Sequence, residues 1–202
     1  ISKKLKILTI AIVTYPFRFE GKVRENNAKA GIEELKKFAD TIIIIQNQKL
    51  LSVVDRKTPI NKAFKKVDEV LFNATKAISD LISIHGLVNL DFADVRTIMN
   101  DMGEAIIGLG EAEGKNRAGR AAYAAINNEM LDEISIAGAK GILINITGGN
   151  DLTLFDVGDA TQAIYEAVGQ DSETNIIFGA VTDPKLRDKV QVTIIATGIN
   201  ES

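Results

Sequence analysis

The stretch PINKAFKKVDEVLFNATKAISDLISIH, residues 59–85, decides how the chain is organised. Its apolar residues recur at spacings of three and four, which is typical of one buried face of a helix. At 1.5 Å per residue, such a helix would be about 40 Å long. A rod of this length predicts a central helix that joins two bodies, one before it and one after it in the sequence.

The segment before the central helix has the pattern of an α/β body. LKILTIAIVT, residues 5–14, is a continuous apolar run of the kind found in buried parallel strands. The loop YPFRFEGK follows it, and then an amphipathic helix is expected over about 23–39. DTIIIIQN reads as a second buried strand that ends at Asn47, before a short helix over 49–54. Strands alternating with helices indicate an α/β fold.

Beyond Gly86 the pattern begins again with its own small core. Three helices are expected, over about 92–101, 117–131 and 155–168. Four strands are expected, at EAIIGLGEA, KGILINIT, NIIFGAVTD and KVQVTIIATG. The last strand places Val190, Val192 and Ile194 on one face by alternation. We therefore predict domains over 1–86 and 87–202, the second with a four-stranded sheet covered by two helices.

Composition excludes several classes of function. The 202 residues carry a net charge of −3, and no basic run suits nucleic acid or an anionic membrane surface. With no cysteine and only His85, neither a disulfide framework nor a thiolate or histidine metal site is expected. The apolar runs are too short to span a bilayer, and no signal peptide is visible, so cytoplasmic residence fits. The chain begins with Ile1 and not Met, so we expect it to be part of a longer natural protein.

Two glycine-containing segments resemble ligand loops but are interpreted as turns. GLGEAEG, residues 108–114, nearly matches a dinucleotide fingerprint, but its spacing is one residue too long. Glu111 and Glu113 would also repel a phosphate. TGGN, residues 147–150, is expected to be a turn between a strand and a helix.

NLDFADVRT, residues 89–97, carries a more specific resemblance. With FRFEGKVR upstream and RTIMNDMGEAIIGLGEAEG and ITGGNDLTLFDV downstream, it resembles the tubulin/FtsZ superfamily, and within it the FtsZ family of bacterial division GTPases. The match covers essentially all 202 residues in order. The GGGTGTG-type signature that holds the GTP phosphates in that family is absent from this sequence.

The resemblance implies a fold, a ligand and partners. It implies part of a Rossmann-like GTPase domain, the central helix, and a second α/β domain. It further implies GTP and GDP binding and head-to-tail self-association into filaments. The expected partners are the amino-terminal half of the same protein and other division proteins, in the cytoplasm at the division site.

Phe64 and Asp68 are four residues apart, so they are neighbours on one face of the central helix. An aromatic ring can stack on a purine, and the carboxylate can accept from N1–H and the amine of guanine. The resemblance places both at the base, although the family more often has asparagine where this chain has Asp68. It makes Asn47 the other base contact. The alternatives are an apolar Phe64 in the core beside a solvated Asp68, and a turn-forming Asn47.

Glu20 and Arg24 follow the first strand, at the end of the sheet where open α/β folds bind ligands. The resemblance assigns Glu20 to the ribose and Arg24 to the vicinity of the phosphates. The alternative is an exposed salt bridge between these two residues, which are four apart in the sequence.

Asp91 and Asp94 suit a helix N-cap and an acidic partner three residues further on. The resemblance adds a catalytic interpretation, in which Asn89, Asp91 and Asp94 enter the nucleotide site of the next subunit. Carboxylates beside a γ-phosphate can orient the attacking water, directly or through Mg²⁺ or another cation. Both roles are compatible, because a helix end is a rigid platform for a functional group.

The sequence therefore predicts the carboxy-terminal portion of a filament-forming GTPase that should not hydrolyse GTP alone. The alternative is a non-catalytic module that caps or copolymerises with intact subunits. A nicotinamide-dependent oxidoreductase rests only on the GLGEAEG segment and ranks last.

Overall fold

The computed structural model describes residues 5, 7–53, 55, 57–83, 91–128, 136–169 and 172–199. The predicted central helix is α3 (Ile60–Ser83), whose 24 residues span about 36 Å. Val67, Val70 and Ala74 lie on its buried face. The helical spacing of apolar residues therefore placed this element correctly as far as the described residues extend.

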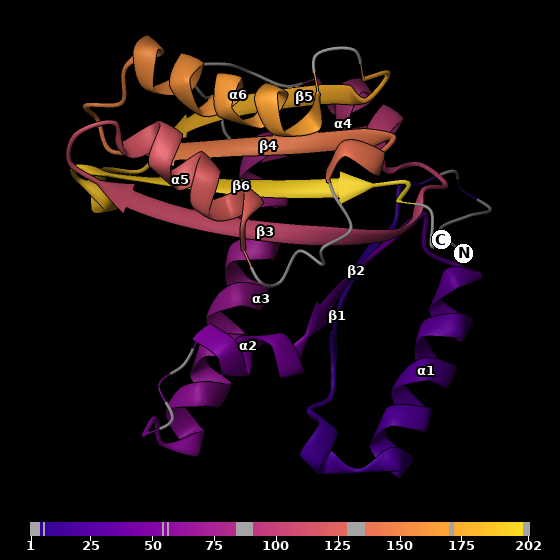
Figure 1. The fold of residues 1–202 in the computed structure, drawn as a ribbon. Helices are drawn as coiled ribbons and strands as arrows, with labels where there is room; N and C mark the ends of the chain where they lie inside the picture. Colours follow the sequence, from indigo (N-terminus) through magenta and orange to yellow (C-terminus); the bar gives the residue numbers. More distant parts are fainter. Residues whose placement is uncertain are drawn as a thin grey trace.

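The strands form one six-stranded sheet in the order β1-β2-β3-β6-β4-β5 (Figure 1). Their bounds are β1 (Ile10–Tyr15), β2 (Thr41–Gln46), β3 (Gly103–Glu113), β4 (Gly141–Gly148), β5 (Asn175–Thr182) and β6 (Lys189–Thr197). β6 runs antiparallel to β3 and β4, whereas β1, β2 and β3 are parallel to one another, as are β4 and β5.

The four strands expected after the central helix are present, and the sheet continues beyond them into β2 and β1. The link is a short parallel pairing in which Thr41, Ile42 and Ile43 face residues 103–105. Asp40 supports the pairings on both sides of β2, because its carbonyl accepts from Gly103 N of β3 at 3.0 Å and its carboxylate accepts from Thr9 N, just before β1, at 2.7 Å. The predicted four-stranded unit is thus part of a larger sheet, with the partly exposed β1 at its edge.

Helices cover both faces of the four C-terminal strands. α5 (Arg117–Ile126) and α6 (Leu154–Val168) pack on one face, where Val190, Val192 and Ile194 of β6 point into an apolar core. α4 (Phe92–Met99) and α3 pack on the other face in a second core. The alternation predicted for β6 is confirmed.

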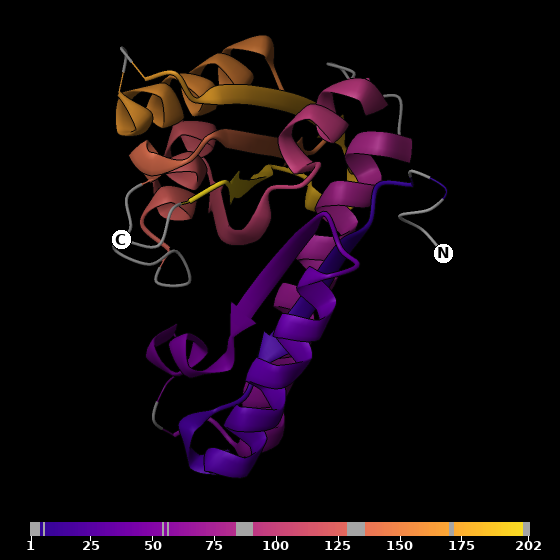
Figure 2. The ribbon, with the colours of Figure 1, turned by 90° about the vertical axis from the view of Figure 1, so that its right-hand side faces the viewer.

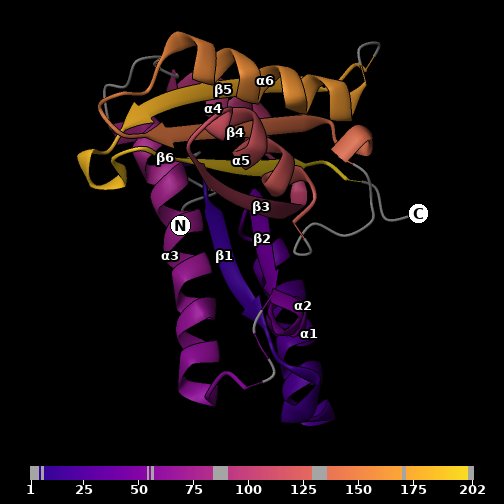
Figure 3. The ribbon, with the colours of Figure 1, turned by 60° about the vertical axis from the view of Figure 1, so that its left-hand side comes forward.

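The remaining elements extend away from this layered body along α3 (Figures 1 and 2). They are α1 (Lys22–Lys36), α2 (Asn47–Val53) and the short 3₁₀ turn η2 (Arg18–Glu20). Two further 3₁₀ turns are η3 (Ile136–Gly138) and η4 (Pro184–Leu186). Figure 3 shows α3 alongside β1 and β2. The proposed division between residues 86 and 87 lies outside the described residues and stays a prediction.

One interpretation of a glycine segment is corrected by the structure. Residues 108–113 of GLGEAEG belong to β3 and pair with β6, and only Gly114, with φ of +77°, has turn geometry. A Cβ on Gly110 would lie 2.0 Å from the carbonyl oxygen of Ala121 in α5. Gly110 therefore permits a close helix–strand contact. The expected turn at TGGN is confirmed, because β4 ends at Gly148 and α6 begins at Leu154.

Candidate functional site

The segments that follow β1 and β2 lie next to each other, because these strands are parallel neighbours that end in register at Tyr15 and Gln46. Glu20, in η2 after β1, accepts a hydrogen bond from Phe17 N through Oε1 at 2.9 Å. Gln48 of α2 reaches across and accepts from Arg18 N at 3.1 Å. The two segments are thereby fixed to each other at the carboxyl ends of the strands.

Three phenylalanines gather at this end of the molecule. The rings of Phe17 and Phe19 stack with centroids 4.9 Å apart, and Phe64 meets Phe17 edge-on at 5.5 Å. They line a pocket of about 400 Å³, whose walls also include Leu51, Asp55, Thr58, Ile60 and Ala63. Phe17 is buried, whereas Phe64 is 41% exposed and can offer ring surface to a partner. Phe64 thus packs against a core residue and also keeps ring surface in solvent, so its role at the base stays a prediction.

Asn47 is the first residue of α2 and not the last of the preceding strand. It is only 6% exposed, and its Oδ1 accepts no hydrogen bond within the part of the chain that the structure describes. A buried acceptor without a donor costs roughly 1–3 kcal/mol. This amide is therefore suited to meeting a donor from outside the described chain.

Asp68 and Arg24 are exposed near the same end. Asp68 lies one turn beyond Phe64 on α3, and Arg24 lies in the first turn of α1. Both Glu20 and Arg24 are described, and no ion pair joins them. The surface salt bridge that offered an alternative for these two residues is not formed.

The acidic residues Asp91 and Asp94 lie on the layered body, away from this pocket. Asp91 is the N-cap of α4, and its carboxylate accepts from Ala93 N at 3.1 Å, as the capping interpretation predicts. Asp94 lies in the first turn of α4 and is exposed. Asn89 lies outside the described residues. Figure 1 places α4 near one end of α3, whereas η2 and α2 lie toward the other.

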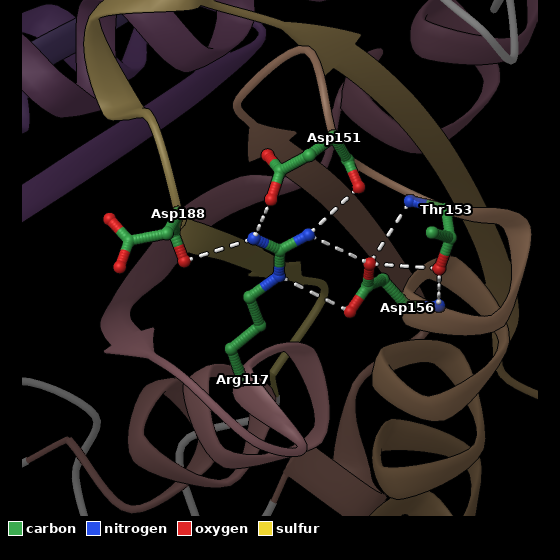
Figure 4. Close-up of polar contacts among 5 residues, drawn as sticks. All are labelled: Arg117, Asp151, Thr153, Asp156 and Asp188. Carbon is green, nitrogen blue, oxygen red and sulfur yellow. Dashed lines mark hydrogen bonds and ion pairs between the residues drawn. The ribbon is translucent and has the colours of Figure 1, made fainter.

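A second polar cluster holds the N-termini of α5 and α6 together (Figure 4). Arg117, 8% exposed, donates to Asp151 Oδ2 at 2.5 Å, to Asp156 Oδ2 at 3.1 Å, and to the Asp188 carbonyl at 3.0 Å. Thr153 caps α6, donating its N–H to Asp156 at 3.0 Å and accepting from Asp156 N at 3.1 Å.

This cluster shifts the pKa values of its members. Burial alone would raise the pKa of Asp156, but hydrogen bonds from Arg117 and Thr153 outweigh it and hold that pKa below 3.8. The hydrogen bonds to Asp156 and Asp151 raise the pKa of Arg117. The cluster therefore stays charged at neutral pH and clamps three segments together.

Sequence reasoning missed Phe17 and Phe19, although the aromatic pair in YPFRFEGK was visible. It also missed Arg117, where an available signal was a cation in the first turn of a helix. Such a charge opposes the helix dipole unless carboxylates compensate it.

Comparison with known proteins places this arrangement in the tubulin/FtsZ class. The model of the tubulin/FtsZ family GTPase domain matches residues 1–55, and that of the FtsZ family C-terminal domain matches residues 103–200. CetZ1 from Haloferax volcanii, solved as a GDP-bound monomer, shares the fold, with a TM-score of 0.78 at 15% identity over 99% of this chain and 58% of its own.

The chain belongs to the FtsZ family. It is 52% identical to cell division protein FtsZ of Magnetospirillum gryphiswaldense, over 96% of this chain and 34% of that protein. It is 50% identical to that of Wolbachia pipientis, over 98% of this chain and 62% of that protein. An empty FtsZ dimer from M. jannaschii superposes with a TM-score of 0.92 at 43% identity, over 98% of this chain and 57% of that chain. The chain thus spans between a third and two thirds of the length of these relatives.

Proposed function

We propose that this chain is the carboxy-terminal portion of a filament-forming GTPase of bacterial cell division. The observation that supports the proposal most is the separation of two groups on one family fold. The aromatic pocket and α2, whose first residue Asn47 has an Oδ1 without a donor in the described residues, lie toward one end of α3, and the acidic start of α4 lies near the other. Each subunit then carries half of two sites.

The pocket end would bind the guanine nucleotide. Phe64 offers ring surface for stacking, and Asp68, one turn along α3, can accept from N1–H and the amine of guanine. Asn47 Oδ1 is free to accept a further hydrogen bond from the base. The contact between Asp68 and guanine would favour GTP over ATP, because adenine lacks the paired N1–H and amine donors.

Glu20 and Arg24 would contact the rest of the nucleotide. Glu20 already uses Oε1 to fix the turn at Phe17, so the carboxylate has a set position and an oxygen left for the ribose. Arg24, exposed in the first turn of α1, would lie near the phosphates. The residues that cradle the phosphates would come from the amino-terminal half.

The acidic end would activate hydrolysis in the neighbouring subunit. Asp94 projects from the first turn of a capped helix, so its backbone position is fixed while its carboxylate stays exposed. Together with Asp91 and Asn89 it would orient the attacking water against the γ-phosphate. Mg²⁺ or another hard cation would suit these oxygen ligands and could lie between them and the phosphate.

Assembly would be head to tail, since the two half-sites differ and cannot pair with themselves. Such a contact does not close and produces filaments. The partners would be further subunits, the amino-terminal half, and other division proteins, with the filament at the division site in the cytoplasm. In the described residues, no helix is both long and apolar enough to cross a membrane.

The test supplies the chain with a separately made amino-terminal half and measures GTP binding and turnover. Asp94→Asn should leave folding and GTP binding intact while lowering turnover about a hundredfold or more, because general acid–base residues contribute roughly that much. Asp91→Asn is the matched variant, since asparagine caps a helix as well as aspartate but carries no charge.

The catalytic proposal predicts that Asp91→Asn also loses turnover without loss of melting temperature. If only Asp91→Ala has an effect, and that effect is a lower melting temperature with normal turnover per assembled subunit, these residues serve capping alone. If no combination of halves hydrolyses GTP but the chain still enters filaments of intact subunits, it is a non-catalytic assembly module.

A further inference from the structure

A broad groove follows the seam between α5 and α6 on the outer surface of the layered body. Its volume is about 800 Å³, and it is lined by Lys115, Asn116, Gly119, Arg120, Tyr123, Asp159, Gln162, Ala163 and Glu166. The small residues Gly119 and Ala163 are half-buried, whereas the other residues that line the groove are exposed. Another molecule could therefore bring its side chains close to the helix backbones.

The two walls of the groove have opposite charge. Lys115 and Arg120 belong to the α5 side, and Asp159 and Glu166 belong to α6. All four are exposed, and none forms an ion pair within the described part of the chain. Arg120 donates to the Glu113 carbonyl at 3.2 Å, and Glu166 accepts from Gln162 at 2.9 Å, so both walls are held in place.

The groove is remote from the parts used in the proposed function. α5 and α6 pack on the face of the sheet opposite α3 and α4, as the separate cores on the two faces show (Figures 1 and 2). The aromatic pocket and Asp94 belong to elements outside the α5–α6 layer. A contact at this groove would therefore lie on the side of a filament rather than at its ends.

We propose that the α5–α6 groove is a lateral contact between two copies of this chain. β3 and β4 both run antiparallel to β6, and α5 and α6 each run back along them, so the two helices are roughly parallel. We place the two copies on a two-fold axis that runs parallel to these helices, so that α5 of each copy lies opposite α6 of the other. The basic α5 side of one copy then faces the acidic α6 side of the other, twice, which is the self-complementarity of an isologous interface.

Charge segregation favours a second copy over an unrelated partner, because each copy brings both complementary walls. Tyr123, 67% exposed on the α5 side, is the side chain best placed to enter the facing groove. Tyrosine suits such a position because it combines apolar area with a polar tip. Since α3 stands crosswise to α6 in Figure 1, the axis reverses α3, so neighbouring filaments joined this way run antiparallel.

The test uses paired charge reversals in the 202-residue chain. An acidic variant carries Lys115→Glu and Arg120→Glu, and a basic variant carries Asp159→Lys and Glu166→Lys. In sedimentation equilibrium at low salt, where charge contacts are least screened, the unaltered chain should dimerise. Each variant alone should dissociate at least about tenfold more readily, because like charges then face each other at both contacts.

An equimolar mixture of the two variants should restore the dimer, since an acidic copy then faces a basic one at both contacts. Circular dichroism and melting temperature confirm that both variants fold. The proposal is overturned if the unaltered chain stays monomeric, if either variant dimerises normally, or if the mixture does not recover.

Covalent capture gives an independent readout, because the chain contains no cysteine. Arg120→Cys and Asp159→Cys, made in separate chains, place thiols on walls that face each other in the dimer, so a short bismaleimide should cross-link their equimolar mixture. Arg120→Cys mixed with Ser172→Cys, in the loop after α6, is the matched control and should not cross-link. Equal cross-linking of the two mixtures would also overturn the proposal.

Discussion

At the scale of single residues, the Arg117 cluster shows how one buried charge is made tolerable. Arg117 opposes the dipole of its own helix, yet two carboxylates and two carbonyls occupy its donors. Removing one partner of a buried pair leaves the other uncompensated. Asp156, which also forms the α6 capping box with Thr153, is therefore the carboxylate whose loss should cost most.

We predict that Asp156→Asn lowers the free energy of unfolding by about 1–3 kcal/mol at pH 7. The pKa of Asp156 is held below 3.8 in the folded chain, so its stabilisation is present above that value. It is lost as pH falls through the folded pKa. Urea unfolding from pH 7 down to pH 3 should therefore show the variant and the unaltered chain converging at the acidic end.

Asp188→Asn is the matched control, because only the backbone carbonyl of Asp188 contacts Arg117 and the substitution keeps that carbonyl. Its stability should match that of the unaltered chain at every pH. A gap between Asp156→Asn and the unaltered chain that stays constant with pH would contradict the charge-based account.

At the scale of elements, the packing of α5 on β3 depends on one glycine. A Cβ on Gly110 would lie 2.0 Å from Ala121 O and 2.5 Å from Ala125 N, both backbone atoms that cannot rotate away. Gly110→Ala should therefore destabilise the chain by about 1–3 kcal/mol through overpacking, measured by urea unfolding. Gly158→Ala adds the same methyl to α6 where nothing lies within 4 Å, and it should be neutral or stabilising.

The same elements show what local sequence patterns can predict. Helical spacing predicted α3, and the alternation of apolar residues predicted which face of β6 is buried, because each pattern lies within a single element. Gly108 and Gly110 were expected both in the strand EAIIGLGEA and in the turn GLGEAEG, because the reason for Gly110 lies in α5, beyond any local window. The pairing of Thr41 with Gly103 joins residues far apart in the chain, so the continuity of the sheet was not predicted.

For the candidate site, local patterns predicted positions but not roles. The i,i+4 spacing placed Phe64 and Asp68 one turn apart on α3, and the N-cap pattern placed Asp91 at the start of α4, while their ligand roles stay predictions. Phe17 and Phe19 sit in a short irregular segment where no periodicity marks them. Arg117 meets carboxylates 34 and 39 residues away, and no single-sequence rule pairs such groups.

At the scale of the whole molecule, the long α3 sets the spacing between the pocket end and the acidic end. A subunit would then supply a nucleotide pocket to one neighbour and an activating helix start to the other. An Asp94→Asn subunit keeps its own pocket, so its defect should appear in the nucleotide bound by the adjacent subunit. GTP turnover would consequently depend on pairs of adjacent subunits and not on individual chains.

This gives a quantitative prediction for mixed filaments. When intact subunits are mixed with an equal number of full-length subunits that carry both Asp68→Ala and Asp94→Asn, about half of the intact pockets meet a defective helix start. The altered pockets bind GTP too weakly to add turnover of their own. GTP turnover per intact subunit should therefore fall to about half, and it should fall further in proportion as the variant fraction rises.

Turnover is measured at constant total protein, with pelleting to show that the variant enters the filaments. The control carries Asp68→Ala and Asp183→Asn, an N-cap substitution at η4 that keeps a capping oxygen, and it should leave turnover per intact subunit unchanged. If turnover per intact subunit is independent of the variant fraction while both chains copolymerise, each subunit hydrolyses its own GTP without its neighbour, and Asp94 has no role across the junction.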